Sequence, residues 1–487
     1  MSEQDADTRG LRVLGVVHVG LYVVLAVFFW TAWTFKKNVI DELVIFVVTG
    51  ALTILYFLGV KFARGARTSA IVMFAAAIAI IGFITPPFDS TDVFFYMATG
   101  WQQAHYGLNP YSKVLRNVDA ALSDPMIQND WMSRNRNPWL DIPVPYGFLF
   151  SLLARGIAWL GHGNLWLTLG LFSLLNLLMH AGTALVLWKA ATVLPHTSGK
   201  VLLYLYGWNP FIVLQHLADL HNDVIVGFLV VLAAYLLLKG RAVWTLPLFV
   251  AAALIKYATL VLIPFALLFL LRSKGWRSAV HGLSLSIFLI VVAAAPYIGE
   301  APSFKYGLIW DQFSESSGSL HAFAVYSLRA FNRMLPTVVP SGAALATITK
   351  VGLWIGFVVF IVYQLRVSWK ERNQDPLAMI QQWTSILFAL IFVASSQFYA
   401  WYIGMVFPLA LLTHRKTILS DCVIALSGAH ILSFTFLRRK AIGYFVIATA
   451  FPILLLLISR YKSARPLLPV LSYEVEEARG MAANASK

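Results

Sequence analysis

Charged residues and cysteine are both scarce in this sequence. Only 12% of the 487 residues are charged, about half of the roughly 25% that is typical of a soluble globular domain. Cys422 is the single cysteine, which excludes an intrachain disulfide and a thiolate metal cluster. The sequence also shows no convincing internal repeat and no low-complexity tract. These absences argue against a water-soluble fold and against a domain held together by disulfides.

Apolar residues are abundant instead. They make up 59% of the chain, and the mean hydropathy is +0.74. Continuous apolar stretches recur between residues 11 and 459, and about 20 such residues are enough for a helix to cross a bilayer. The stretches do not alternate with polar residues as strands of a barrel would. The sequence therefore predicts an all-α, polytopic transmembrane helical bundle of roughly twelve to fourteen membrane helices, with residues 11–33 as a retained anchor.

Basic residues lie at the ends of the apolar stretches. The formal net charge is +15, but the basic residues form small clusters and not one continuous stripe, which favours membrane orientation over nucleic-acid binding. We assign these clusters to the cytoplasmic face: Lys61/Arg64/Arg67, Lys239/Arg241, Arg272/Lys274/Arg277, Arg366/Lys370, His414/Arg415/Lys416 and Arg460/Lys462. Such clusters can also hold an anionic lipid or phosphate.

The same assignment organises the chain. Residues 1–460 form one predicted integral membrane domain, and residues 461–487 form a cytoplasmic tail. Two polar segments, about 86–145 and 299–340, fall on the outer face and are expected to carry short interfacial helices. A single helix over 242–271 would put two basic ends on opposite sides, so we expect two short helices there, with Lys256 and Tyr257 near the tip of the hairpin. Residues 146–160, which include Arg155, are expected to form a partial or interfacial helix.

The segment 87–96, Pro-Phe-Asp-Ser-Thr-Asp-Val-Phe-Phe-Tyr, directly follows an apolar stretch. Its carboxylates, Asp89 and Asp92, are three residues apart and share one face if the chain is helical. Apolar surroundings make a carboxylate a better base near neutral pH, so both are candidate catalytic residues. The alternative is that Asp89 and Ser90 only cap the next helix.

A second polar cluster, His221-Asn222-Asp223, is preceded by Asp219 and lies between two apolar stretches. Ionisable residues at membrane depth are costly and usually functional, and these three offer donors and acceptors suited to sugar hydroxyls. The cluster could instead cap the following helix. It could also bind a divalent metal, although the spacing is not diagnostic.

Several further residues are candidates for substrate binding. Lys256 interrupts an apolar stretch and needs an anion or a water-filled cavity, unless it extends to a headgroup. Exposed arginines are mostly only solvated, so we expect at most one or two of the further phosphate candidates to touch substrate. These candidates are Arg134, Arg136, His321, Arg329 and Arg333. Tyr399, Trp401 and Tyr402 can stack on a sugar ring or an isoprenoid, or simply anchor a helix at the interface.

In this order, the clusters resemble those of the GT-C class of integral membrane glycosyltransferases. They are most similar to the polyprenol-phosphomannose-dependent alpha-1,6-mannosyltransferase family of bacterial envelope lipoglycans. The stretches that carry the resemblance span about residues 85–408. They are Ser90-Thr91-Asp92-Val93 through Tyr96, Gly107-Leu108-Asn109-Pro110-Tyr111, Pro145-Tyr146-Gly147, Asn209-Pro210 with His221-Asn222-Asp223, Lys256, and Tyr399 to Tyr402.

The resemblance implies that Asp92 is the catalytic base. Two features depart from the family pattern: Tyr-Gly-Pro reads Tyr146-Gly147-Phe148 here, and Asp89 adds a second carboxylate. The resemblance implies a reaction that moves a hexose, namely mannose, from a polyprenyl-phosphate carrier to a cell-envelope glycan or glycolipid at the outer face of the membrane. Membrane lipid is a further expected partner, and nucleic acid is not expected.

An inverting mechanism follows from the chemistry of that donor. A polyprenyl phosphate leaves as an anion, so the enzyme needs a base for the acceptor and positive charge beside the phosphate. Lys256 and one of the arginine or histidine candidates would face the phosphate, and residues 221–223 would orient the sugar or acceptor. No cofactor is required by this scheme, although a divalent cation is possible. The competing class is a transporter or flippase of a lipid-linked sugar, which would leave its substrate chemically unchanged.

Overall fold

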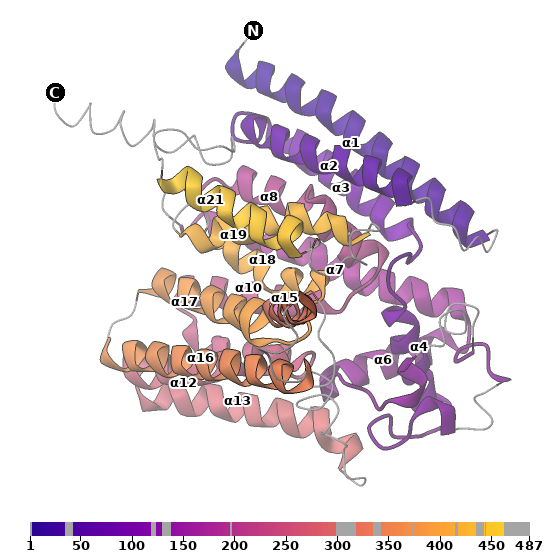
Figure 1. The fold of residues 1–487 in the computed structure, drawn as a ribbon, viewed down its shortest axis with the longest axis vertical. Helices are drawn as coiled ribbons and strands as arrows, with labels where there is room; N and C mark the ends of the chain where they lie inside the picture. The colour runs from indigo at the N-terminus through magenta and orange to yellow at the C-terminus, as the bar shows by residue number, and fades with distance from the viewer. Residues whose placement is uncertain are drawn as a thin grey trace. The chain divides into compact units, whose positions relative to one another are not determined.

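A computed structural model describes residues 2–34, 42–117, 123–128, 138–194, 197–298, 318–334, 342–371, 375–413, 417–434, 443 and 445–461. Every regular element within these ranges is helical (Figure 1). An isolated antiparallel bridge between Gly318 and Gln397 is the only strand-like pairing among them. The predicted cytoplasmic tail lies outside the described residues from residue 462 onward.

Many of the helices are long and apolar. Among the described residues, seven could cross a membrane: Glu3–Thr34, Leu43–Ala63, Leu165–Ala191, Tyr257–Lys274, Trp276–Tyr297, Ala344–Lys370 and Pro376–Ala394. The bent pair Pro210–Ala218 and Asp223–Leu238 makes an eighth if it counts as one span. Six shorter apolar helices of 10–17 residues accompany them in the same described ranges. The all-α, polytopic class is thus confirmed. The predicted twelve to fourteen membrane helices are reached among the described residues only if the six shorter helices are counted together with the seven or eight spans.

The outer surfaces of these helices are apolar. On α16 (Gly342–Lys370), Val351, Ile355, Val358 and Val359 each expose more than half of their surface. A soluble protein rarely exposes a contiguous apolar face of this kind. Lipid tails can cover it without the free-energy penalty that water would impose. The protein is therefore an integral membrane protein.

The chain divides into two compact units. The first comprises Met1–Pro86, Leu187–Leu214 and Ala410–Lys487, and the second comprises Pro87–Val186 and Gln215–Leu409. All of the predicted site residues except Asn209 and Pro210 belong to the second unit.

The first unit contains α1 (Glu3–Thr34), α2 (Glu42–Ala63), α3 (Thr68–Ile84), α8 (Gly199–Gly207), α9 (Pro210–Val213), α19 (Ile418–Ala429), η12 (His430–Phe434), η14 (Val446–Ala450) and α21 (Phe451–Tyr461). Helix α1 packs against both α2 and α3. Tyr204 donates from its hydroxyl to the Tyr56 carbonyl at 2.7 Å, and Tyr56 donates to the Leu205 carbonyl at 2.8 Å. Asn209 accepts from Ile212 N–H and so caps α9, which gives the Asn209-Pro210 motif a structural role in this unit.

The second unit holds the remaining elements. They are α4 (Asp92–Ala104), η1 (Leu115–Asn117), η3 (Pro138–Asp141), α6 (Phe148–Gly161), η4 (Leu214–Ala218), α10 (Asp223–Leu238), η5 (Ala242–Trp244), α11 (Thr245–Ala253), η6 (Tyr257–Leu262), α12 (Ile263–Phe269), η7 (Leu270–Lys274), α13 (Trp276–Ala294), η8 (Ala295–Tyr297), α15 (Leu320–Met334), α16, α17 (Pro376–Phe388), η10 (Ala389–Ala394) and η11 (Ala400–Tyr402). Helices α7 (Leu165–Ala191) and α18 (Ile403–Leu412) each run from one unit into the other.

Two local predictions are confirmed in this unit. The 242–271 stretch is broken at Leu254 to Lys256, and α11 packs against both η6 and α12 on the other side of the break. The expected short helix in 146–160 is α6, which packs along α4 and leaves Arg155 exposed. Short helices also occur within both segments that we assigned to the outer face.

Candidate active site

Asp92 is the first residue of α4 and is nearly buried. Its backbone N–H donates to Ser90 Oγ at 3.1 Å, which fixes the start of the helix. Thr91 occupies the N-cap position and makes no side-chain capping bond. The capping alternative therefore explains Ser90 in part, but it leaves the Asp92 carboxylate available for another purpose.

The Asp92 carboxylate faces His221. Asp92 Oδ2 lies 3.5 Å from His221 Nδ1, an ion-pair distance that lacks the geometry of a hydrogen bond. The His221 ring is fully buried and stacks on Trp401, with ring centroids 4.1 Å apart and planes inclined by 11°. Trp401 stacks in turn on Tyr399, with centroids 4.6 Å apart. The structure thus joins the first acidic motif to the 221–223 cluster and to the aromatic segment.

A second charged pair lies at the start of α10, where Asp223 is the first residue. Lys256 Nζ donates to both carboxylate oxygens of Asp223, at 2.9 and 3.0 Å. The ammonium also lies over the Tyr402 ring, 4.1 Å from its centroid. The Asp223 side chain is fully buried, whereas the Lys256 side chain is 16% exposed. Lys256 is therefore held by a carboxylate on one side and by an aromatic ring on another, at the break between α11 and η6.

The residues before α10 form a sharp bend in the chain. The helix pair Pro210–Ala218 and Asp223–Leu238 bends by 117° across the break. Leu220 adopts φ +58°, a left-handed conformation that is unfavourable for a residue with a side chain. Asn176 on α7 donates from Nδ2 to the carbonyls of His216 at 2.8 Å and His221 at 3.3 Å. These bonds satisfy backbone carbonyls that the interrupted helix leaves open.

Asp219 connects this bend to the segment that precedes α4. Its Oδ1 accepts hydrogen bonds from the backbone N–H groups of Phe88 at 2.9 Å and Asp89 at 3.0 Å. The Asp219 side chain is fully buried. In the sequence, Asp219 stands out only as a neighbour of the 221–223 cluster, because a contact across 130 residues leaves no local signal. In the structure it positions the backbone three residues before the candidate base.

Buried polar atoms without a hydrogen-bond partner concentrate on the same bend. Within the described residues, they include both side-chain polar atoms of Gln215, His216, His221 and Asn222, together with Asp219 Oδ2. A buried polar group that remains unsatisfied costs about 1–3 kcal/mol, and native proteins leave few of them. The bend therefore concentrates buried donors and acceptors of the kind that native proteins usually satisfy with a partner, and sugar hydroxyls can both donate to and accept from such groups.

The motifs Asn109-Pro110-Tyr111 and Pro145-Tyr146-Gly147 contact each other and the chain segment just before Lys256. Gly147 N–H donates to the Ile255 carbonyl and Phe150 N–H to the Leu254 carbonyl, both at 3.1 Å. A Cβ on Gly147 would come within 2.3 Å of the Leu254 carbonyl oxygen, so only glycine fits there. The Tyr146 carbonyl accepts from the Tyr111 hydroxyl at 2.9 Å. The Asn-Pro-Tyr and Pro-Tyr-Gly motifs thus hold the break that carries Lys256.

The other predicted phosphate-binding residues are not placed beside Asp92 by any contact in the described part of the chain. Arg134 and Arg136 lie outside the described residues, as does the side chain of Arg333. His321 on α15 is buried, and its Nε2 lies 2.9 Å from the Ala346 carbonyl of α16. Arg329 is exposed on the same helix. Of the predicted set, direct contacts join Asp92, His221, Trp401 and Tyr399, and likewise Asp223, Lys256 and Tyr402. Asp89 is connected through its backbone bond to Asp219. Asn222 lies between His221 and Asp223 in the chain, and its buried side chain makes no hydrogen bond within the described residues.

The remaining acids of the 86–145 segment have structural partners or lie outside the described residues. Asp124 accepts from Trp101 Nε1 at 2.7 Å and from the Tyr106 hydroxyl at 2.9 Å. Asp141 forms an exposed ion pair with Arg116, and the hydrogen bond from that guanidinium lowers the pKa of the Asp141 carboxyl. Residues 119 and 130 are not among the described ones. In the described part of the chain, no group of three or more His, Cys, Asp or Glu side chains is arranged to hold a metal ion.

Comparison with known proteins points in one direction. A family model described as "Alpha-(1->6)-mannopyranosyltransferase, N-terminal domain" matches residues 11–272, more than half of the chain. Alpha-(1->6)-mannopyranosyltransferase A of Mycobacterium tuberculosis (strain ATCC 25618 / H37Rv) is 25% identical over 351 residues, which cover 67% of this chain and 63% of that protein. The match therefore spans less than two thirds of the relative's length. No solved structure matches the chain.

Proposed function

Since the chain belongs to the alpha-(1->6)-mannopyranosyltransferase family, we propose that it transfers a mannosyl residue from a polyprenyl-phosphate carrier to a glycan or glycolipid acceptor of the cell envelope. The reaction takes place at the outer face of the membrane and inverts the anomeric centre. The observation that carries this proposal is the contact between the Asp92 carboxylate and the buried His221 ring, beside a bend with many unsatisfied polar atoms.

Asp92 is the proposed base. As an acceptor hydroxyl attacks the anomeric carbon, its proton passes to the Asp92 carboxylate and a new carbon–oxygen bond forms. The bond from the anomeric carbon to the phosphate oxygen breaks, and the phosphate leaves with the electron pair. Attack from the face opposite the leaving group converts a beta-linked donor into an alpha-linked product. A carboxylate nucleophile, as retaining glycosidases use, is not required.

Lys256 supplies positive charge for the departing phosphate in this scheme. Its ammonium is oriented by Asp223 but keeps some exposure, and a phosphate oxygen can replace the weaker contact with Tyr402. Charge placed in advance where negative charge develops is an effective source of transition-state stabilisation. The bend residues His221 and Asn222 then orient the sugar or acceptor hydroxyls. Trp401 is stacked between His221 and Tyr399, so the half-buried Tyr399 ring is the proposed stacking surface for a sugar.

Substitution of the two candidate carboxylates tests the proposal. In detergent, the purified protein should release free polyprenyl phosphate when it is incubated with polyprenyl-phosphate mannose and an acceptor. Asp92→Asn should lower the rate of this release by more than tenfold, which corresponds to an increase of about 1.4 kcal/mol in the activation barrier. Asp89→Asn serves as the matched control and should retain more than a tenth of the rate, as should Asp141→Asn. If Asp92→Asn turns over at more than a tenth of the wild-type rate, Asp92 is not the base.

The choice of donor is tested in the same assay. Polyprenyl-phosphate mannose should be consumed, and nucleotide sugars should not. Turnover of nucleotide sugars alone would overturn the assignment of the donor. A parallel reaction with chelator measures any need for a divalent cation, which lipid-linked donors with a single phosphate do not demand.

One observation favours the alternative of transport. A helix broken by 117° near ionisable residues is a common feature of transporter binding sites. Transport of a lipid-linked sugar would leave the sugar–phosphate bond intact, so the release of polyprenyl phosphate together with a glycosylated product separates the two functions.

A further inference from the structure

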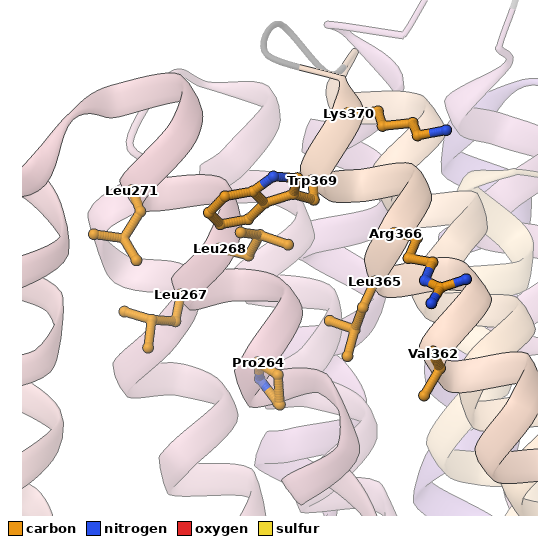
Figure 2. Close-up of a pocket in the computed structure, with 9 residues that line it drawn as sticks. All are labelled: Pro264, Leu267, Leu268, Leu271, Val362, Leu365, Arg366, Trp369 and Lys370. Carbon is orange, nitrogen blue, oxygen red and sulfur yellow. The ribbon is translucent and has the colours of Figure 1, made fainter.

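An apolar groove lies between two candidate membrane spans of the second unit. It has a volume of about 760 Å³ and is formed by the α12–η7 segment on one side and by α16 on the other. Figure 2 shows its apolar lining residues Pro264, Leu267, Leu268, Leu271, Val362 and Leu365. This volume falls within the range that accommodates a small ligand or part of a lipid, about 300–1,000 Å³.

One end of this groove is basic. Arg366 and Lys370 belong to its lining, near the end of α16. Trp369 extends from the same helix toward Leu268 and Leu271 (Figure 2). The Arg272 guanidinium lies over the Trp369 ring, 4.7 Å from the ring centroid. The groove therefore combines an apolar floor with cationic side chains at one end.

Within the described residues, no ion pair involves any of the three cations Arg272, Arg366 and Lys370. Glu371 directly follows Lys370 in the sequence. Arg272 Nε is buried and has no hydrogen-bond partner in that part of the chain. Positive charge of this kind at the rim of an apolar groove is complementary to a phosphate that carries a hydrocarbon chain.

The membrane spans fix the depth of this basic end. Tyr257–Lys274 and Ala344–Lys370 are both candidate spans, and each ends in basic residues. The contact between Arg272 and Trp369 brings these two ends together. Basic residues at the end of a span lie at the level of the lipid headgroups. Sixteen residues separate Lys256 from Arg272, or roughly 24 Å of helix at 1.5 Å per residue. The basic end is therefore remote from the site around Asp92.

We propose that this groove binds one anionic glycerophospholipid of the surrounding membrane. Its headgroup phosphate contacts Arg366, Lys370 and Arg272, and an acyl chain follows the apolar floor toward Pro264 and Val362. The bound lipid fills the space between α12 and α16. This binding does not depend on the proposed transferase activity, because none of the residues that line the groove takes part in that site.

Lipid titration tests the proposal on the whole protein in detergent. Native mass spectrometry with phosphatidylglycerol should show one tightly retained lipid, and phosphatidylcholine should bind at least tenfold more weakly. The double variant Arg366→Gln with Lys370→Gln should weaken retention of phosphatidylglycerol by roughly 25-fold, at about fivefold for each cation near the headgroup. The matched control, Lys239→Gln with Arg241→Gln, removes the same charge from another basic cluster and should bind as the wild type does.

A second variant tests the apolar floor without a change of charge. Leu268→Trp fills the groove and should also weaken retention of phosphatidylglycerol by at least tenfold. If the double variant does not insert into the membrane, Leu268→Trp alone tests the proposal. Equal binding of phosphatidylcholine and phosphatidylglycerol overturns the proposal. Retention of phosphatidylglycerol within threefold of wild type in either groove variant overturns it as well. Release of polyprenyl phosphate is measured in parallel, so a failure of this inference is distinguishable from a failure of the proposed function.

Discussion

The pair formed by Lys256 and Asp223 offers the sharpest test of how the site is held together. The two side chains are joined by hydrogen bonds of 2.9 and 3.0 Å. Their surroundings differ, because Asp223 is fully buried and Lys256 retains 16% of its exposure. The two single substitutions should therefore have unequal effects on stability.

Lys256→Met leaves a buried carboxylate without its cation, and loss of one partner of a buried pair costs about 3–5 kcal/mol. Asp223→Asn leaves an ammonium that can still reach water or the Tyr402 ring, so the cost is nearer to that of a lost charge-assisted hydrogen bond, about 1.5–3 kcal/mol. Lys256→Met with Asp223→Asn removes both charges, and the free energy of unfolding should recover part of the loss caused by Lys256→Met alone.

Thermal unfolding in detergent, followed by tryptophan fluorescence, measures the order of the variants. The midpoint should fall least for Asp223→Asn, further for the double variant and furthest for Lys256→Met. Lys239→Met is the control, since Lys239 is an exposed lysine of the same unit, and its effect should stay within about 0.5 kcal/mol. The reasoning fails if Lys256→Met is as stable as Asp223→Asn, or if the double variant is no more stable than Lys256→Met.

Two other contacts make predictions of the same kind. Asp219→Leu removes the acceptor of two backbone N–H groups just before Asp92, so kcat should fall at least tenfold with KM less affected. Asp219→Asn keeps one acceptor oxygen and should recover most of the rate. Equal kcat values for the two variants would contradict this role. Gly147→Ala places a Cβ against the Leu254 carbonyl and should cost about 1–3 kcal/mol of stability, while the control Gly156→Ala meets no neighbouring atom and should be neutral or slightly stabilising in the same unfolding measurement.

Hydropathy and charge predict the parts of this fold that depend on local sequence. Apolar stretches of sufficient length must form helices in a bilayer, because each backbone polar group has to be satisfied within its own segment. The distribution of charge predicts the break near Lys256, since one helix could not place the basic residues at both ends of 242–271 on one side of the membrane. These predictions require no knowledge of which helices are neighbours.

The contacts that build the site depend on tertiary structure instead. The stacking of His221 on Trp401 joins residues 180 positions apart, and nothing in either motif specifies its partner. The need for glycine at 147 is equally invisible in sequence, because the clash that excludes a side chain comes from the Leu254 carbonyl. Individual motifs could therefore be identified as candidates, but their arrangement around Asp92 could not be derived from spacing.

The bend at residues 219–222 explains why these motifs meet at all. A helix interrupted inside a membrane protein exposes carbonyl and amide groups that must find partners, and here Asn176 satisfies the carbonyls of His216 and His221. Because the chain turns there, the side chains of Asp219, His221 and Asp223 are presented to three different neighbours: the segment before α4, Trp401 and Lys256. A straight helix would place residues 219 and 223 on one face. The bend thus brings the Asp92 carboxylate, the Lys256 ammonium and the Trp401 ring together from distant parts of the sequence.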